Sequence, residues 1–260
     1  LHNLLDAVRT AGRLTIVSGT GMTLGADALL VEWLRWTILA VTGSLDRAGG
    51  MMFDPGLLHP IDRRPPAPFP AAPPSPGPAS RPDLRRVFGE LPSIAIPDEI
   101  ASGNIRCLVV LGGNPLTAIS NPARTAQIFE KLDALIVLDI LETPLTRMAS
   151  HVLSVTGQLE RDDVVVESRT MLAPAVVSPV GERRAAWRVL AGIGQRLGVD
   201  ILDGADAEAL SDSDMIRTMI AAGGADVDAF IAAGPDGVAH ARRGGWVREK
   251  LLINGNWRLV

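Results

Sequence analysis

The stretch from Leu108 to Asp139 constrains the fold of this chain more than any other. It contains two apolar runs, Leu108–Leu111 and Ala134–Leu138, separated by Gly112-Gly113-Asn114-Pro115 and by a helical segment from Ala123 to Leu132. Runs that are apolar at every position are typical of parallel strands buried on both faces. The order strand, glycine turn, helix, strand therefore predicts a βαβ unit, and with it an α/β fold that has a Rossmann-like parallel sheet and flanking helices.

The same stretch carries features of a nucleotide site. Ligands of open parallel sheets bind at the carboxyl ends of the strands, where a glycine turn lets the backbone approach a phosphate. Asp139 ends the second run and can accept hydrogen bonds from ribose hydroxyls. An ordinary βαβ unit with a tight turn and a solvated aspartate is the alternative. A nicotinamide- or flavin-binding domain would need a Gly-x-Gly-x-x-Gly turn, which Gly112-Gly113-Asn114-Pro115 does not match.

A second segment has the same order of features near the start of the chain. Arg13–Ser18 is predicted to be a strand that runs into Gly19-Thr20-Gly21, and Ala28–Val41 is predicted to be a helix with Gly43 at its C-terminal cap. The helical period places Glu32 and Arg35 away from an apolar face. That predicted face consists of Leu30, Trp33, Leu34, Ile38 and Val41.

A proline-dense segment separates the two parts. The sequence RRPPAPFPAAPPSPGPASRP cannot supply the N–H groups of a strand ladder and is typical of extended polyproline-like chain. We interpret it as a spacer, with a surface lid or partner-binding strap as the alternative. The expected organisation is a strand–helix piece at residues 1–53, a proline-rich linker at 54–85 and a Rossmann-like dinucleotide-binding domain at 86–260.

Composition excludes several classes of function. A net charge of −4 argues against a nucleic-acid partner, and no apolar run reaches the roughly 18 residues of a membrane span. The single cysteine, Cys107, rules out a disulfide within the chain or a cysteine-ligated iron–sulfur cluster built from these residues, and we expect it to be buried at the start of its strand. The four histidines lack metal-ligand spacing, so no metal ligand and no catalytic residue is predicted here.

Further elements are predicted beyond the βαβ unit. They comprise a short helix from Pro97, a helix start at Thr143-Pro144, strands at His151–Val155, Val164–Val166 and Met171–Val177, helices at Arg184–Leu197, Ala207–Ala222 and Val227–Ala233, and a hairpin turn at Asn254-Gly255.

Four segments together carry a resemblance to a known family. They are TIVSGTGMTLGADALLVEWLRWTILAVTGSLDRAGG from Thr15, LGGNPL from Leu111, VLDILETPLTRMASHVLSV from Val137 and GERRAAWRVLAGIGQRLG from Gly181. In this order and spacing they resemble the molybdopterin oxidoreductase family, whose members carry molybdenum or tungsten on pyranopterin guanine dinucleotides. The resemblance implies that the chain is the central part of a longer subunit, similar to the large subunits of formate dehydrogenases and nitrate reductases, which holds the guanine dinucleotide part of a molybdenum bis(molybdopterin guanine dinucleotide) cofactor.

The resemblance also implies which residues bind that cofactor. Each is carried over from a matching motif position, and Asp139 is the strongest candidate because a carboxylate suits paired ribose hydroxyls or the N–H edge of guanine. The full set is Gly19, Thr20, Gly21, Leu24, Gly113, Asn114, Ala118, Leu138, Asp139, Ile140 and Val155. By the same resemblance, an iron–sulfur cluster and the metal-ligand residue belong outside this chain. The cofactor, rather than the protein, would carry the redox chemistry.

Departures from the family pattern keep an alternative open. Ser150 and Ser154 stand where members carry Asp and Pro, and Ala186 stands where many carry an acid. A pterin-less relative that serves as the structural large subunit of an electron-transfer complex is therefore the second hypothesis. Expected partners are the remaining domains of the same polypeptide, a small-molecule substrate and electron-transfer subunits. The expected location is the cytoplasm, with the periplasm as the alternative.

Overall fold

The structure is a computed structural model, which describes residues 2–52, 56–58, 76–86, 90–167 and 169–239. The chain divides into two units, each described here by itself. Unit 1 comprises Leu1–Arg64, Val166–Met171 and Ile220–Val260, and unit 2 comprises Pro65–Val165 and Leu172–Met219. Most of the proline-rich segment and the predicted hairpin at Asn254-Gly255 lie outside the described residues.

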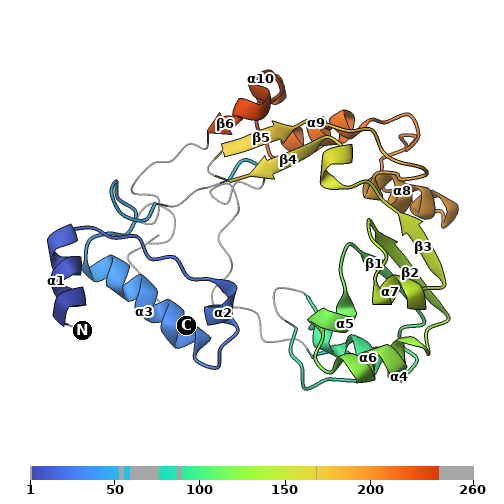
Figure 1. The fold of residues 1–260 in the computed structure, drawn as a ribbon, viewed down its shortest axis with the longest axis horizontal. Helices are drawn as coiled ribbons and strands as arrows, with labels where there is room; N and C mark the ends of the chain where they lie inside the picture. Colours follow the sequence, from blue (N-terminus) through green and yellow to red (C-terminus); the bar gives the residue numbers. More distant parts are fainter. Residues whose placement is uncertain (1, 53–55, 59–75, 87–89, 168, 240–260) are drawn as a thin grey trace. The chain divides into compact units, whose positions relative to one another are not determined.

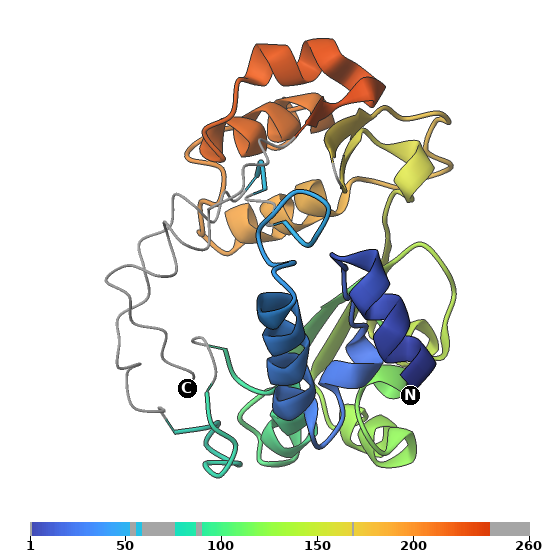
Figure 2. The same cartoon turned by 90° about the vertical axis from the view of Figure 1, so that its left-hand side faces the viewer.

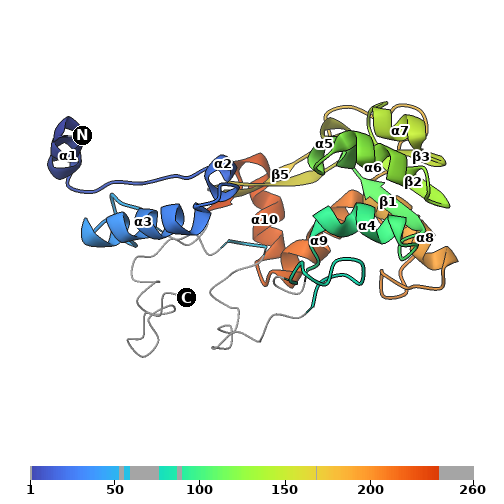
Figure 3. The same ribbon diagram turned by 90° about the horizontal axis from the view of Figure 1, so that it is seen from below.

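Unit 2 contains the predicted βαβ unit. Strands β1 (Cys107–Leu111), β2 (Ala134–Asp139) and β3 (His151–Ser154) form a parallel sheet in that order. Figures 1 and 3 show the helices gathered around these strands. They are α4 (Ile96–Ala101), preceded by the 3-10 turn η2 (Ser93–Ala95), then α5 (Pro115–Ala118), α6 (Pro122–Phe129) and α7 (Pro144–Met148). The α/β fold with a parallel sheet and flanking helices is confirmed.

One apolar core holds this unit together. Leu108, Val110, Leu135 and Val137 share one face of the sheet by strand alternation. They form a cluster with residues of all four helices, namely Ile100, Leu116, Ile128, Phe129 and Leu145. The helices of this core therefore cover a single face of β1 and β2.

The opposite face of β1 corrects two predictions. Val109 is 43% exposed and Leu111 is 51% exposed, so β1 is not buried on both faces. Cys107, which shares their face, is exposed as well rather than buried. An apolar sequence identifies the strand, but burial also needs a covering layer, and the four helices of the core lie on the other side.

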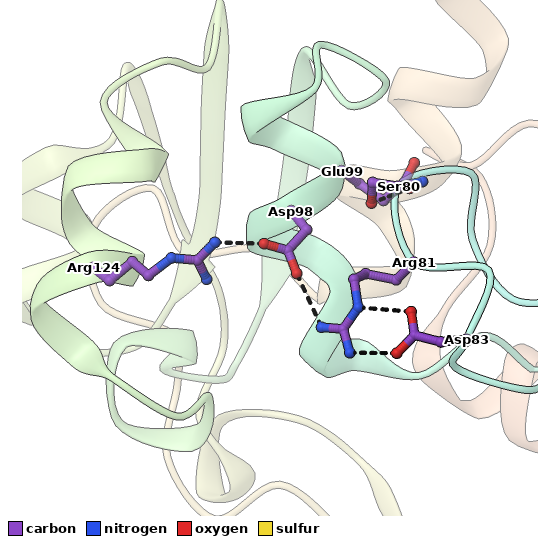
Figure 4. A network of polar contacts seen from close by, with 6 residues as sticks. All are labelled: Ser80, Arg81, Asp83, Asp98, Glu99 and Arg124. Carbon is purple, nitrogen blue, oxygen red and sulfur yellow. Dashed lines mark hydrogen bonds and ion pairs between the residues drawn. The ribbon is translucent and has the colours of Figure 1, made fainter.

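A polar network attaches the end of the proline-rich segment to α4 (Figure 4). Ser80 donates from its backbone N and its Oγ to Glu99 Oε1, at 2.6 and 2.5 Å. Arg81 donates to both carboxylate oxygens of Asp83, at 2.9 and 2.7 Å, and to Asp98 Oδ2 at 3.2 Å. Arg124 of α6 pairs with the other oxygen of Asp98. The residues around Ser80 are thus tied to two helices of the unit.

The remainder of unit 2 contains the 3-10 turn η3 (Gln158–Glu160) and helices α8 (Ala186–Arg196) and α9 (Asp212–Ala222), the last three residues of which belong to unit 1. The predicted start of α9 at Ala207 is wrong. Ser211 and Asp214 form reciprocal hydrogen bonds between side chain and backbone, which is the capping box that begins a helix. Arg188 instead donates to the carbonyl oxygens of Ala207 and Leu210, upstream of that cap.

Unit 1 contains α1 (His2–Ala11), α2 (Thr20–Thr23) and α3 (Ala28–Val41), the long blue helix of Figure 2, together with α10 (Val227–Ala233) and the 3-10 turn η4 (Gly234–Asp236). The bounds of α3 match the prediction, and Gly43 follows it with φ +63°. The predicted orientation of α3 is wrong. Glu32 and Arg35 are part-buried, and they pair with each other and reach Ser18 and the carbonyl of Ile16. The residues of the predicted apolar face are exposed instead.

The predicted strand at Arg13–Ser18 is not formed. This segment has no regular secondary structure, and side chains satisfy part of its backbone. Ser44 Oγ accepts from Leu14 N at 3.1 Å, and Arg35 donates to Ile16 O at 3.2 Å. A strand needs a neighbouring strand for its ladder, and none pairs with this segment among the described residues.

A second sheet has the order β4 (Asp163–Val166), β5 (Arg169–Ala173), β6 (Val238–Ala239). Strands β5 and β6 are antiparallel, with Thr170 opposite Val238. The strands predicted at Val164–Val166 and Met171–Val177 therefore belong to a second sheet, separate from the parallel one. The second predicted strand is shorter than expected because Pro174 follows Ala173 and has no N–H for the ladder.

Candidate functional site

The carboxyl edge of the parallel sheet brings together the candidate residues of unit 2. The register places Leu111 beside Leu138 and Asp139 beside Ser154, so the three strands end at one edge. Two backbone hydrogen bonds join the segments that follow. Gly112 N donates to Leu138 O at 2.9 Å, and Val155 N donates to Asp139 O at 3.2 Å. Gly113, Asn114, Ile140 and Val155 therefore emerge from the sheet at the same edge as Asp139.

The glycine turn after β1 has one glycine that the backbone requires and one that it does not. Gly112 has φ +58°, a conformation that L side chains rarely adopt. Gly113 has no such restriction, and a Cβ added there would meet only the carbonyl oxygen of Leu111, at 3.9 Å. The space beside Gly113 is therefore open. Asn114 caps α5 by accepting from Leu116 N at 3.2 Å, and Ala118 is the exposed last residue of that short helix.

Asp139 is partly ordered by its own turn. Its Oδ1 accepts from the backbone N of Ile140 at 2.7 Å and of Leu141 at 3.2 Å. Its Oδ2 forms no hydrogen bond within the described residues. Ile140 is 43% exposed. The turn thus holds the carboxylate in one orientation and leaves one oxygen as a hydrogen-bond acceptor.

Two predicted site residues have buried side chains. Leu138 is fully buried, and Val155 is 5% exposed. The carbonyl oxygen of Leu138 and the N–H of Val155 already take part in the backbone bonds described above. Neither side chain can contact a ligand without a rearrangement of the core, so these residues shape the edge through their backbone.

A hollow of about 410 Å³ lies beside this edge. Asp139 and Ile140 line it together with residues that the sequence analysis did not include among the cofactor-binding candidates, namely Leu141, Glu142, Thr146, Arg147, Val152, Ser154 and Arg183. Gly113 and Asn114 are not among the lining residues. Arg147 and Ser154 lie in the same family segment as Asp139, so their nearness in sequence could have indicated them. Arg183 lies in the separate segment that begins at Gly181, and nothing in the sequence places it beside Asp139.

Ion pairs order the two arginines of the hollow. Arg147 Nε donates to Glu142 Oε1 at 2.7 Å, and both side chains are largely exposed. Arg183 Nη1 donates to Oε1 and Oε2 of Glu160, at 2.8 and 3.0 Å. Glu160 also accepts from the backbone N of Gly157 at 2.8 Å. This backbone hydrogen bond, with help from Arg183, holds the pKa of Glu160 below its ordinary value, so that it stays ionised.

The candidate residues of unit 1 form a separate group. Gly19 precedes α2, where its carbonyl oxygen accepts from Met22 N at 3.0 Å, and Leu24 N donates to Thr20 O at 3.0 Å. Gly19, Thr20 and Gly21 are exposed, and Leu24 is 85% exposed. A Cβ at Gly19 or Gly21 would meet nothing within 4 Å. The predicted glycine turn is therefore the entry to a single helical turn with free space around it.

Ser150, one of the departures from the family pattern, has a structural contact. Its Oγ accepts from Leu135 N and donates to Leu135 O, both at 3.0 Å. The serine therefore links the start of β3 to β2. Ser154 lies at the other end of β3 and lines the hollow.

Two further features of the described residues bear on function. No group of three His, Cys, Asp or Glu side chains within them could hold a metal ion. No helix in the described part of the chain is both long and apolar enough to cross a membrane.

Comparison with known proteins identifies the family. The model of the molybdopterin oxidoreductase family matches residues 1–196, which is more than half of the chain. The chain therefore belongs to the molybdopterin oxidoreductase family, as the four sequence segments predicted. Membership implies a molybdenum or tungsten pterin cofactor, and the named relatives are oxidoreductases.

Individual relatives agree with this assignment. The alpha subunit of a formate dehydrogenase from Methanocaldococcus jannaschii is 28% identical over 109 residues, which are 40% of this chain and 16% of that protein. A dimethyl sulfoxide/trimethylamine N-oxide reductase from Rhodobacter capsulatus is 29% identical over 137 residues, which are 49% of this chain and 17% of that protein. The matched region thus spans less than a fifth of either relative.

Among solved structures, acetylene hydratase from Pelobacter acetylenicus matches with a TM-score of 0.47 and 17% sequence identity. The match covers 57% of this chain and 20% of that one.

Proposed function

We propose that the carboxyl edge of the β1-β2-β3 sheet binds the guanine dinucleotide part of a molybdenum pterin cofactor, within a larger oxidoreductase. The proposal rests mainly on the position of Asp139 and on the contacts of its carboxylate. Asp139 ends a central parallel strand, where ligands of α/β sheets bind. The turn holds one oxygen of its carboxylate, the other oxygen forms no hydrogen bond within the described residues, and the residue lines a hollow. An oriented carboxylate of this kind suits vicinal ribose hydroxyls or the N–H edge of a guanine.

The neighbouring residues fit such a group. The hollow of about 410 Å³ falls within the range of roughly 300–1,000 Å³ of small-molecule sites. Ser154 adds a hydroxyl group to its lining, and Arg183 adds N–H donors. Among the described residues only the carbonyl oxygen of Leu111 lies near the open space beside Gly113, which supports close approach of a ligand to that turn.

The bound cofactor would supply the oxidation–reduction chemistry, while the protein binds and orients it. In this chain Asp139 would accept hydrogen bonds from the nucleoside. Ser154 would donate or accept from the lining, and the backbone at Gly113 and Asn114 would border the nucleotide. The residues Gly19, Thr20, Gly21 and Leu24 of unit 1, with Ala118, Leu138, Ile140 and Val155 of unit 2, remain proposed contacts that stand on the family resemblance.

Titration of the 260-residue chain with guanosine diphosphate tests the proposal. We expect measurable binding by calorimetry, and we expect Asp139→Ala to weaken it by about tenfold or more, since a hydrogen bond to a charged group contributes roughly 1.5–3 kcal/mol. The matched control is Asp133→Ala, which removes an exposed carboxylate just before the same strand, at the opposite edge of the sheet. Equal affinity of the wild type and Asp139→Ala would exclude this edge as the nucleotide site.

A pterin-less relative remains the second candidate, favoured by one observation. Ser150 makes structural hydrogen bonds with Leu135 where cofactor-binding members carry an acid. The two candidates differ in cofactor content. Metal and guanine-dinucleotide analysis of the purified oxidoreductase that contains this chain would give a stoichiometric cofactor under the first proposal and none under the second.

A further inference from the structure

We propose that Arg183, held in place by Glu160, makes this hollow select guanine over adenine. The inference rests on the proposed function, because it assumes that the hollow beside Asp139 receives the nucleoside. Arg183 lies in the fourth family segment, which begins at Gly181, and it was not among the predicted cofactor-binding residues.

Arg183 lines the same hollow as Asp139, and its Nη2 donates to the carbonyl oxygen of Ile140 at 3.4 Å. Its Nη1 is engaged by the two carboxylate oxygens of Glu160. A guanidinium has five N–H donors. The N–H of Nε and the second N–H of Nη2 form no hydrogen bond within the described residues, so they remain available to a ligand.

The guanidinium of Arg183 is held rigidly by Glu160. The Glu160 side chain is only 7% exposed, and backbone N–H groups of Gly157 and Val180 donate to it, at 2.8 and 3.3 Å. It contacts Arg183 with both oxygens. Glu160 is therefore a positioning residue, which fixes the arginine in one rotamer at the wall of the hollow.

The side chains around the hollow carry a net negative formal charge. Arg147 is paired with Glu142, and Arg183 is paired with Glu160. Asp139 forms no ion pair with a described residue, so its carboxylate leaves these five side chains with a negative formal charge. A diphosphate is disfavoured beside them because it is itself negatively charged. A neutral base that both donates and accepts hydrogen bonds is the better match, which assigns the hollow to the nucleoside end of the cofactor.

Guanine and adenine differ in the hydrogen-bonding groups that they would present to Arg183 and Asp139. Guanine presents acceptors at O6 and N7 and donors at N1 and N2, and arginine is the usual partner of its acceptor edge. A carboxylate such as Asp139 suits its donor edge. Adenine presents an N6 amino group where guanine has O6, so the arginine would face a donor. Arg183 and Asp139 are thus complementary to guanine and unmatched to adenine.

The experiment compares guanosine and adenosine monophosphates by calorimetry on the 260-residue chain. We expect the wild type to prefer the guanine nucleotide by about tenfold or more, and Arg183→Gln to bring the two affinities within about threefold, since one bidentate contact discriminates by roughly 1–3 kcal/mol. Arg184→Gln is the matched control. Arg184 is the adjacent arginine, and its side chain pairs with exposed Glu208 outside the hollow.

A second variant separates a loss of guanine selectivity from a loss of folding. Arg183→Gln leaves the carboxylate of Glu160 without its partner, whereas Arg183→Lys keeps a positive charge beside it but loses the planar fork. We expect Arg183→Lys to retain the thermal stability of the wild type and still to lose the preference for guanine. If both variants discriminate as the wild type does, the inference fails while the proposed function stands. If the wild type binds no guanine nucleotide, the proposed function fails, and the inference fails with it.

Discussion

Two glycine turns lead into helices in this molecule, one in each unit, and their surroundings differ. The turn at Gly112 follows strand β1, which is paired with β2 and packed on four helices. The turn at Gly19 follows an extended segment whose described backbone contacts are made by side chains such as Arg35 and Ser44. Gly112 has positive φ, whereas Gly19 has φ −99°. Similar local sequence thus produces a strand only where a neighbouring strand completes the ladder.

The sheet core next to the turn at Gly112 should be far more sensitive to mutation than the extended segment before Gly19. Leu135→Ala in β2 removes a side chain that is 3% exposed, and we expect it to lower the free energy of unfolding by about 2–5 kcal/mol. Val17→Ala in the extended segment removes a side chain that is 85% exposed, and we expect a change within about 0.5 kcal/mol. Denaturant unfolding measures the free energy of unfolding of both variants. A similar decrease in the two would contradict this prediction.

The glycines themselves give a smaller and more local contrast. Gly112→Ala places a Cβ on a residue at φ +58°, and we expect a loss of about 1–2 kcal/mol from backbone strain. Gly21→Ala lies inside α2, has no neighbour within 4 Å of its added Cβ, and should be neutral or stabilising by up to about 1 kcal/mol. Thermal unfolding of the two variants measures their stability relative to the wild type. A stabilising effect of Gly112→Ala would show that the turn after β1 relaxes.

The smallest expected effect depends on pH and concerns the network on α4 (Figure 4). Arg124 first, and then Arg81, lower the pKa of Asp98 from its ordinary value. A carboxyl whose pKa is lower in the folded chain stabilises it above the ordinary pKa of roughly 3.9, and this stabilisation is lost as the pH falls through the folded value. We therefore expect Asp98→Asn to lower the stability at pH 7, by an amount that shrinks as the pH falls below about 4.

The control for that measurement is Glu130→Gln. Glu130 is exposed and forms no ion pair within the described ranges. Its substitution should leave stability nearly unchanged across the same pH series. If the wild type and Asp98→Asn differed by the same amount at every pH, the contribution of Asp98 would be one of packing rather than of charge.

The sequence by itself determined the local elements of this protein. The apolar runs and the glycine and proline signals located β1, β2, α3 and the start of α7 to within a residue or two, because these signals act through neighbouring residues. Thr143 accepts from the backbone N of Thr146 and caps α7 as its position before a proline predicts. The family also followed from sequence, because four separated motifs occur in the right order.

Only the tertiary structure decided what depends on distant partners. The segment before Gly19 lacks a strand neighbour, Cys107 and Val109 lack a covering layer in the described structure, and α3 presents Glu32 toward the chain because Arg35 and Ser18 receive it there. Arg183 reaches the hollow beside Asp139 because the buried Glu160 holds it there. Strand pairing, burial and contacts such as Glu32 with Ser18 or Arg183 with Glu160 join residues that are 14 or more positions apart, so no local pattern encodes them.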